Sequence, residues 1–263
     1  MDIAPLIGLI IGLGAIAGAA VLEGLHFSSL LQPTAAVIVL GGTFGATFTS
    51  FPLSVAIGAF RDAAKVFRIA SLNQSQELIA DICVFAAQAR KNGLLALEQE
   101  AKNHKDRFMR KAIALSVDGV DPTDIQILLE TDMQADEEHA KQSAEFFEAA
   151  GGYAPTIGII GAVLGLIHVM SNLEDTSKLG AGIAVAFVAT IYGLVTANII
   201  CLPIASKIKF LIKEEMVRKE IIIAGICAMQ SGQNPRLIAE RLNAYLGTRA
   251  EETRTGATSG GTA

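Results

Sequence analysis

Four long stretches of this chain carry no Asp, Glu, Lys or Arg, although charged residues are frequent between them. They are Ile3–Leu22, Gly24–Phe60, Ala149–Leu173 and Leu179–Ser206. Each holds about 20 residues or more, which is the length that a helix needs to cross a hydrocarbon core roughly 30 Å thick. The sequence therefore predicts an integral membrane protein with four transmembrane helices.

The composition places part of the chain in water. A hydrophobic fraction of 51% and a mean hydropathy of +0.46 are high for a soluble domain, whereas 18% charged residues are too many for a chain wholly in lipid. The net charge of -5 argues against a nucleic-acid partner, because binding phosphates needs a concentrated basic surface. Cys83, Cys201 and Cys227 are far apart and form no CxxC pair, so neither a disulfide framework nor a zinc site is indicated.

The distribution of positive charge predicts the topology. Of the 21 Lys and Arg residues, 11 lie in residues 61–150, 9 lie in residues 207–254, and Lys178 is the remaining one. Loops rich in Lys and Arg stay in the cytoplasm, so both of these segments and both termini are expected there. The first apolar run lacks a basic segment and a small-residue cleavage site, which indicates a retained helix and not a signal peptide.

This topology divides the chain into five parts of an all-α protein with a helical cytoplasmic domain. They are a transmembrane hairpin (1–60), a cytoplasmic helical domain (61–148), a second transmembrane hairpin (149–208), a cytoplasmic C-terminal helix (209–246) and a disordered tail rich in Gly, Thr and Ser (247–263).

Two helix starts can be read in the cytoplasmic part. Asn73 or Ser75 is a candidate N-cap for a helix that Gly93 interrupts. Asp121 followed by Pro122 is a second start, with proline at the first helical position. From there the sequence stays compatible with a helix through Gly151 and Gly152, so one long helix is expected to enter the third span.

Small residues at helical spacing predict close contacts between membrane helices, because helices in lipid gain little from burying apolar surface. Pairs four residues apart are Gly8 and Gly12, Gly14 and Gly18, and Gly161 and Gly165; a stripe follows Gly182, Ala186, Thr190, Gly193 and Ala197. Thr190 has two interpretations. Its hydroxyl either bonds back to its own helix in a packing interface or lines an ion path.

The sequence resembles the MotA/PomA flagellar stator family along essentially its whole length. The resemblance rests on GGYAPTIGIIGAVLGL at 151–166, GAGIAVAFVATIYG at 180–193, LGGT at 40–43 and ARKNGLLALE at 89–98. Within the family, the chain resembles the MotC-type subunits most. The resemblance implies an inner-membrane proton channel without cofactors, in which several copies surround a MotB-like partner that has one span, an ion-binding aspartate and a peptidoglycan-binding domain.

The resemblance also assigns roles to individual residues. It implies that Arg90 and Glu98 contact the rotor protein FliG, whereas without it both belong to an ordinary solvated surface. Pro155 and Pro203 match prolines linked to coupling in the family. From the residues alone, each is either a hinge or a static kink. Sodium-type members tend to carry threonine where this chain has Ala162, so protons are the expected ion.

Two alternatives differ in function. An ExbB/TolQ-like channel subunit would energise outer-membrane processes; such relatives are expected to have three spans, and the hairpin over 1–60 argues against this class. A membrane scaffold held by glycine-rich contacts would conduct no ion. An enzyme is the least favoured class, because the motifs assemble no nucleophile with a base, metal cluster or phosphate loop.

Overall fold

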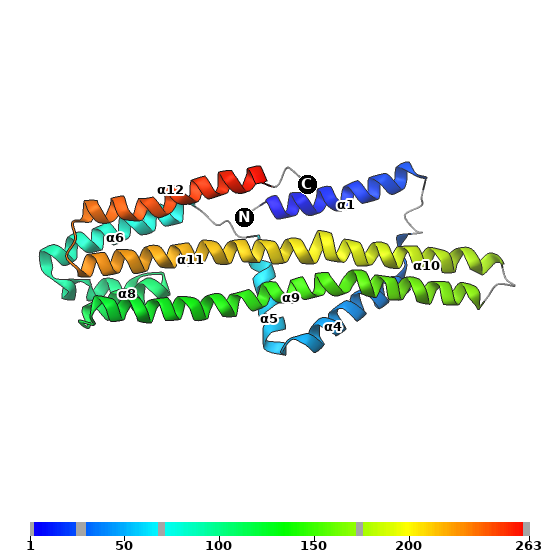
Figure 1. The fold of residues 1–263 in the computed structure, drawn as a ribbon, viewed down its shortest axis with the longest axis horizontal. Helices are drawn as coiled ribbons and strands as arrows, with labels where there is room; N and C mark the ends of the chain where they lie inside the picture. Colours follow the sequence, from blue (N-terminus) through cyan, green and yellow to red (C-terminus); the bar gives the residue numbers. More distant parts are fainter. Residues whose placement is uncertain (1–2, 25–29, 68–71, 172–175, 260–263) are drawn as a thin grey trace. The chain divides into compact units, whose positions relative to one another are not determined.

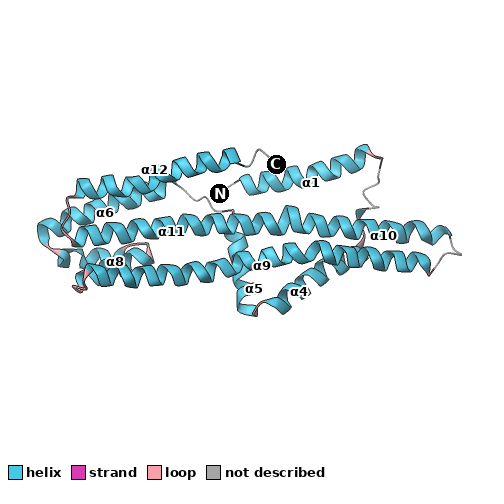
Figure 2. Cartoon of the chain, in the orientation of Figure 1, coloured by secondary structure: helices cyan, strands magenta, loops and turns pink. Residues whose placement is uncertain are grey.

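The computed structural model describes residues 3–24, 30–67, 72–171 and 176–259, and every regular element in these ranges is a helix (Figure 2). The prediction of an all-α protein is therefore confirmed for the described residues. The chain divides into two compact units. Unit 1 comprises Met1–Ile69 and His139–Leu211, and unit 2 comprises Ala70–Glu138 and Ile212–Ala263.

Unit 1 contains the apolar helices. Its first half consists of α1 (Ala4–Leu22), α3 (Pro33–Ala36), the π-helical segment η1 (Val37–Gly41), α4 (Gly42–Ser50) and α5 (Leu53–Lys65). Its second half consists of the C-terminal part of α9 (Pro122–Met170), α10 (Thr176–Val195), the π-helical segment η3 (Thr196–Cys201) and the first part of α11 (Leu202–Gln230). In this unit α10 lies along α9 (Figure 1).

Unit 2 contains α6 (Leu72–Asn92), the 3-10 segment η2 (Leu94–Leu97), α7 (Glu98–Asn103), α8 (Arg107–Val117) and α12 (Pro235–Ser259), with the remaining parts of α9 and α11. Helices α6 and α12 lie side by side (Figure 1). The core is built from long aliphatic side chains that are almost fully buried: Ile82, Leu97, Met109, Ile113, Ile125, Leu129, Ile221, Ile222, Ile226, Ile238 and Leu242.

Within the described part of the chain, three helices are long and apolar enough to cross a membrane: Ala4–Leu22, Pro122–Met170 and the continuous helix Gly182–Gln230. They correspond to the first, third and fourth predicted spans. The second predicted span, Gly24–Phe60, is not one helix. Among its described residues, one helical stretch runs through α3, η1 and α4 from Pro33 to Ser50, Phe51 and Pro52 are extended, and α5 begins at Leu53.

The break after Ser50 follows from the chemistry of proline. The ring of Pro52 disfavours the helical conformation for Phe51, whose backbone has φ -129° and ψ 147°. Helix α5 then starts separately at Leu53. The absence of charge up to Phe60 had concealed this break, because an uncharged run does not distinguish one helix from two.

The predicted helix starts have mixed outcomes. Helix α6 is already helical at Leu72, so neither Asn73 nor Ser75 caps it and that prediction was wrong. Gly93 does end α6, with φ 81°. The start at Pro122 is confirmed, and the carboxylate of Asp121 accepts a hydrogen bond from the backbone N–H of Thr123 at 2.9 Å.

Helix α9 confirms the single long helix, since its 49 residues pass through Gly151 and Gly152 without interruption. The C-terminal region differs from its prediction. One helix was predicted over 209–246, but the structure has two. Helix α11 ends at Gln230, Gly232 turns the chain with φ 71°, and α12 begins at Pro235. The prediction of a disordered tail over 247–263 was wrong as far as Ser259, because α12 passes Gly247 and the Arg, Ala and Glu residues that follow favour a helix. Residues 260–263 lie outside the described residues.

Candidate functional site

The contact between α9 and α10 is made of backbone against backbone. A Cβ atom placed on Gly193 would lie 2.6 Å from the carbonyl oxygen of Ala154, and one placed on Gly165 would lie 2.8 Å from the backbone nitrogen of Ala186. Gly161 is equally tight, with the Cβ of Ala189 at 2.7 Å. These distances confirm the close contact predicted for Gly161 and Gly165, and they leave no room for larger residues.

The glycines of α1 behave differently. A Cβ atom on Gly8, Gly14 or Gly18 would meet nothing within 4 Å, and one on Gly12 would be in ordinary contact with the side chain of Ile199 at 3.4 Å. Helix α1 therefore does not use these glycines for a tight contact with any other described residue.

Thr190 lies on α10, next to the residue that packs on Gly161. Its side chain is half-buried, and its hydroxyl donates to the carbonyl oxygen of Ala186 at 3.3 Å. The packing interpretation predicts this hydrogen bond to the helix's own backbone. That Thr190 also lines an ion path stays a prediction. Ala162, the neighbour of Gly161 on α9, is also half-buried.

Both predicted coupling prolines lie within continuous helix. Pro155 is half-buried inside α9, and Pro203 is exposed near the start of α11. Because proline has no N–H, Pro203 removes one helix hydrogen bond. The π-helical segment η3 ends two residues before it, and such segments are places where a helix departs from regular geometry. The structure thus places a second irregularity beside Pro203, and the hinge role stays a prediction.

Two polar features of unit 1 were missed by the sequence analysis. The hydroxyl of Tyr192 donates to the carbonyl oxygen of Leu30 at 2.6 Å and accepts from the N–H of Gln32 at 3.3 Å, which ties α10 to the residues before α3. The hydroxyl of Thr43 is buried and has no partner among the described residues. A tyrosine inside an apolar run was the only sequence signal for the first of these contacts.

Unit 2 contains a cleft of about 1180 Å³ with charged walls. Asp106 caps α8 by accepting the N–H of Phe108 at 2.7 Å, and the same carboxylate pairs with Arg218 of α11. Arg218 also pairs with Glu215 at 2.6 Å. Burial alone would lower the pKa of the Arg218 guanidinium, but its contacts with Glu215 and Asp106 raise it above the ordinary value.

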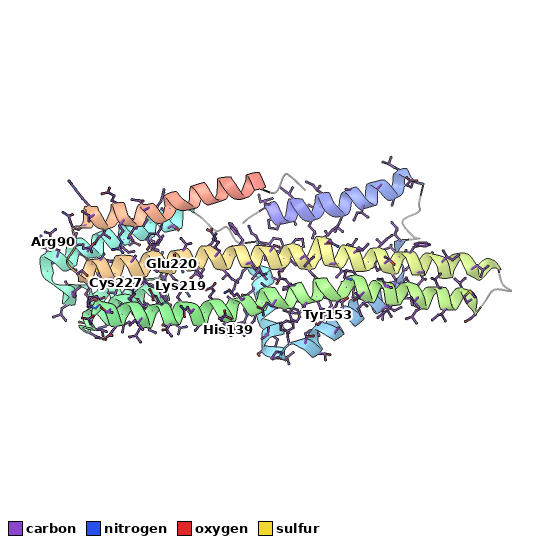
Figure 3. The ribbon with its side chains drawn as sticks, viewed as in Figure 1. Arg90, His139, Tyr153, Lys219, Glu220 and Cys227 are labelled. Carbon is purple, nitrogen blue, oxygen red and sulfur yellow. The ribbon has the colours of Figure 1, made fainter. Side chains whose placement is uncertain are left out.

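Lys219 forms a second charged contact in this cleft. Its side chain is only 6% exposed, its ammonium lies 2.5 Å from the carboxylate of Asp136 on α9, and it sits 5.2 Å from the centre of the Phe108 ring (Figure 3). The cleft therefore joins α8, α9 and α11 through ion pairs.

Arg90 and Glu98 are both exposed on unit 2. Arg90 lies in the last turn of α6 (Figure 3). Glu98 is the first residue of α7. The ammonium of Lys102 lies 2.7 Å from Glu98, and this hydrogen bond and charge lower the pKa of the Glu98 carboxyl. Both charges are therefore available on the surface, and contact with a rotor stays a prediction.

Comparison with known proteins identifies the family. Residues 6–93 match the family described as motility protein A N-terminal, and residues 100–221 match the MotA/TolQ/ExbB proton channel family. Motility protein A of Treponema phagedenis is 37% identical over 251 residues, which are 94% of each chain. The chain belongs to the motility protein A family. This family is not a class of enzymes.

Two further members of the motility protein A family extend the comparison. The chemotaxis protein PomA of Vibrio alginolyticus is 37% identical over 254 residues, covering 96% of this chain and 99% of PomA. The structure of the flagellar MotAB stator complex from Bacillus subtilis matches with a TM-score of 0.84 at 34% identity, covering 94% of this chain and 97% of the matched chain. The similarity therefore includes both units and is not confined to the apolar helices.

Proposed function

We propose that this chain is the stator subunit of a bacterial flagellar motor. With a MotB-like partner it forms a proton channel and converts ion flow into torque on the rotor. The observation that carries this proposal is the match of nearly the whole chain to a subunit of a flagellar stator complex. The runs 149–173 and 179–206 contain no Asp or Glu. A proton channel usually has a carboxylate at membrane depth, so this supports a partner that supplies one.

The proposed topology has four spans in the inner membrane and both termini in the cytoplasm. The stretch from Pro33 to Ser50 is the remaining span, because roughly 18 helical residues are about 27 Å long, close to the thickness of a hydrocarbon core. The Lys and Arg residues of 61–150 and 207–254 support this orientation.

The proposed ion site lies where the partner's aspartate meets α9 and α10. Proton binding there would change one charge in a low-dielectric environment, which alters how the surrounding helices pack. Thr190 and Ala162 line the path, and the missing hydroxyl at Ala162 favours H+ over Na+. Pro155 and Pro203 allow the helices to respond, and several copies of the chain form a ring around the partner.

The decisive experiment is to purify the complex from its native host in mild detergent and to identify the co-purifying chain by mass spectrometry. A partner with one span, an intramembrane aspartate and a peptidoglycan-binding domain supports the stator. An ExbD/TolR-like partner would instead support the second candidate function, energising the cell envelope. This candidate is retained because residues 100–221 match a family that includes TolQ and ExbB. Purification without any partner would favour a scaffold.

The ion is tested by motility in cells that have no other stator set. Rotation should persist when sodium is replaced by potassium, because no threonine hydroxyl stands at Ala162 to ligate Na+. A strict sodium requirement would contradict the proton assignment without changing the stator assignment.

The rotor contact with FliG is tested by reversing single charges. Arg90→Glu and Glu98→Lys should reduce torque while the complex still assembles, because both side chains are exposed and contribute little to the fold. Arg236→Glu, an equal change at an exposed position of α12, is the matched control. Normal torque in both test variants would refute these residues as the contact.

A further inference from the structure

His104 occupies the link between α7 and α8 in unit 2. Its ring nitrogen Nδ1 accepts the backbone N–H of Asp106 at 3.1 Å, and its carbonyl oxygen accepts a hydrogen bond from the Arg110 guanidinium at 2.9 Å. The ring packs edge-on against Phe85 of α6, with 6.0 Å between centres, and its side chain is 16% exposed. His104 is therefore held in one orientation on the wall of the cleft.

This orientation determines where the ring carries its proton. Because Nδ1 accepts a hydrogen bond, the neutral ring must hold its hydrogen on Nε2, which lies 3.8 Å from the carboxylate of Asp81. A second proton can bind only at Nδ1. There it would meet the N–H of Asp106, so protonation and the closed turn exclude each other.

The turn has consequences beyond its own residues. His104 is the residue that ends α7, and Asp106 is the N-cap of α8. The carboxylate of Asp106 also pairs with Arg218 of α11. Opening the turn would therefore displace α7, which begins at Glu98, relative to α8 and α11.

We propose that His104 is a second proton-binding site of the motor, on the cytoplasmic side, and that its protonation opens the turn between α7 and α8 and lowers torque. The regulatory part of this inference rests on the proposed stator function. The ligand is a cytoplasmic proton, and the site is separate from the partner's aspartate.

The direction of the pH effect follows from the hydrogen bond. Imidazole is the side-chain group that ordinarily titrates near about pH 6.5. The closed turn needs an unprotonated Nδ1 to accept the N–H of Asp106, so acidification favours the open turn and higher pH favours the closed one. In the open state the protonated ring pairs with Asp81.

Charged groups from every neighbouring element line the same cleft as His104 or contact it. They are Glu77 and Asp81 on α6, Glu100 on α7, Lys105 and Asp106 on the link, Arg107, Arg110 and Lys111 on α8, Asp132 and Asp136 on α9, and Glu215, Arg218 and Lys219 on α11. Asp81 is the carboxylate nearest to Nε2 of the ring, at 3.8 Å, and it becomes an ion-pair partner once the ring is protonated.

Replacing His104 with asparagine separates two properties of the side chain: accepting the hydrogen bond of the turn and taking up a proton. An Asn side chain accepts the N–H two residues further on, as Nδ1 does here, but it does not titrate. His104→Asn should therefore keep the turn closed at every pH. His139→Asn on α9, at an exposed position, is the matched control. His104→Leu removes the acceptor and should resemble the acidified protein at neutral pH.

The test measures torque in cells without another stator set, with the internal pH clamped at values from about 7.5 to about 6 at constant proton-motive force. The wild type and His139→Asn should lose torque over this range, and His104→Asn should lose less. Loss of one hydrogen bond corresponds to a roughly fivefold change in the ratio of closed to open turns. A response of His104→Asn identical to that of the wild type overturns the inference.

A second measurement does not depend on rotation or on the leucine variant folding. In the purified full complex, the imidazole of His104 and the amide of Asp106 are followed by NMR, with His104→Asn identifying the imidazole signal. The amide signal should shift with the same midpoint as the imidazole. If the amide signal of Asp106 does not change when the imidazole is protonated, the inference fails. If the wild type never supports rotation, the proposed function fails, and this titration still decides the turn.

Discussion

Units 1 and 2 are both helical, but they hold their helices together in opposite ways. In unit 1, α9 and α10 meet through Gly158, Gly165 and Gly193, with backbone atoms in direct contact. In unit 2, long side chains such as Ile82, Ile226 and Leu242 fill the core. Unit 1 leaves large apolar side chains outside, and Leu22, Ile11 and Ile10 are 90%, 64% and 61% exposed.

The difference reflects the two solvents proposed for the units. Water drives apolar side chains together, so unit 2 buries them and exposes its charges. Lipid gives no such force, so membrane helices associate through close packing of small residues and leave their large side chains in the hydrocarbon. The same helical period therefore encodes two kinds of core, and substitutions should affect them differently.

The largest effect should come from emptying the core of unit 2. Ile226→Ala removes a fully buried side chain and should lower the free energy of unfolding by about 2–5 kcal/mol, through lost burial and the cavity left behind. Ile10→Ala on exposed α1 is the matched control and should have little effect. Thermal unfolding of the purified complex measures both. Equal losses would mean that the two units do not differ as described.

A smaller loss should follow from adding one methyl group to the seam of unit 1. Gly193→Ala would place a Cβ atom 2.6 Å from the carbonyl oxygen of Ala154, so α9 and α10 must separate, at a cost of about 1–3 kcal/mol. Gly152→Ala on α9 meets nothing within 4 Å and should leave stability unchanged or slightly raised. The yield of assembled complex reports the difference, and normal yield for Gly193→Ala would contradict a tight seam.

These contrasts explain which parts of the fold the sequence predicts. Long uncharged runs, Pro122 after Asp121 and the spaced glycines from Gly161 to Gly193 are local or periodic signals. They predicted three of the apolar helices, the start of α9 and the tight contact between α9 and α10. The break at Pro52 was missed because charge alone was used to define the second run. The cap of α6 was misplaced because serine within a helix resembles a cap.

The candidate site was less predictable, because its contacts join distant parts of the chain. Tyr192 bonds to Leu30, and Arg218 bonds to Asp106, across 162 and 112 residues. No spacing rule relates such pairs. The rotor contact predicted for Arg90 and Glu98 came from family resemblance alone, since an exposed charge has no periodic signature, and it stays a prediction.

Asp106 tests whether unit 2 depends on its polar contacts as well as its core. Asp106→Ala removes both the cap of α8 and the pair with Arg218 and should cost about 1–2 kcal/mol. Asp106→Asn keeps an oxygen that can cap the helix and loses only the charge. It should therefore lower the free energy of unfolding by about half as much as Asp106→Ala, or less. Thermal unfolding separates the two variants. Equal losses would show that the ion pair, and not the cap, is what α8 needs.

The smallest effect should come from Glu220, an exposed carboxylate of α11 that lies in unit 2 (Figure 3). Partial burial, and then the charge of Glu137, raise the pKa of the Glu220 carboxyl above its ordinary value. The folded state therefore keeps this proton to a higher pH than the unfolded state, and it loses stability as the pH rises through that window.

Glu220→Gln has no charge to desolvate, so at pH 7 it should be more stable than the wild type. Solvent screening at this exposed position limits the gain to about 0.5 kcal/mol or less. The difference should vanish at about pH 3, where the carboxyl is protonated in both the folded and the unfolded state. Glu215→Gln is the control of opposite sign, because it removes a partner of Arg218 and should lower stability at pH 7. If both variants change stability in the same direction, the carboxylates of α11 do not act through these local charges.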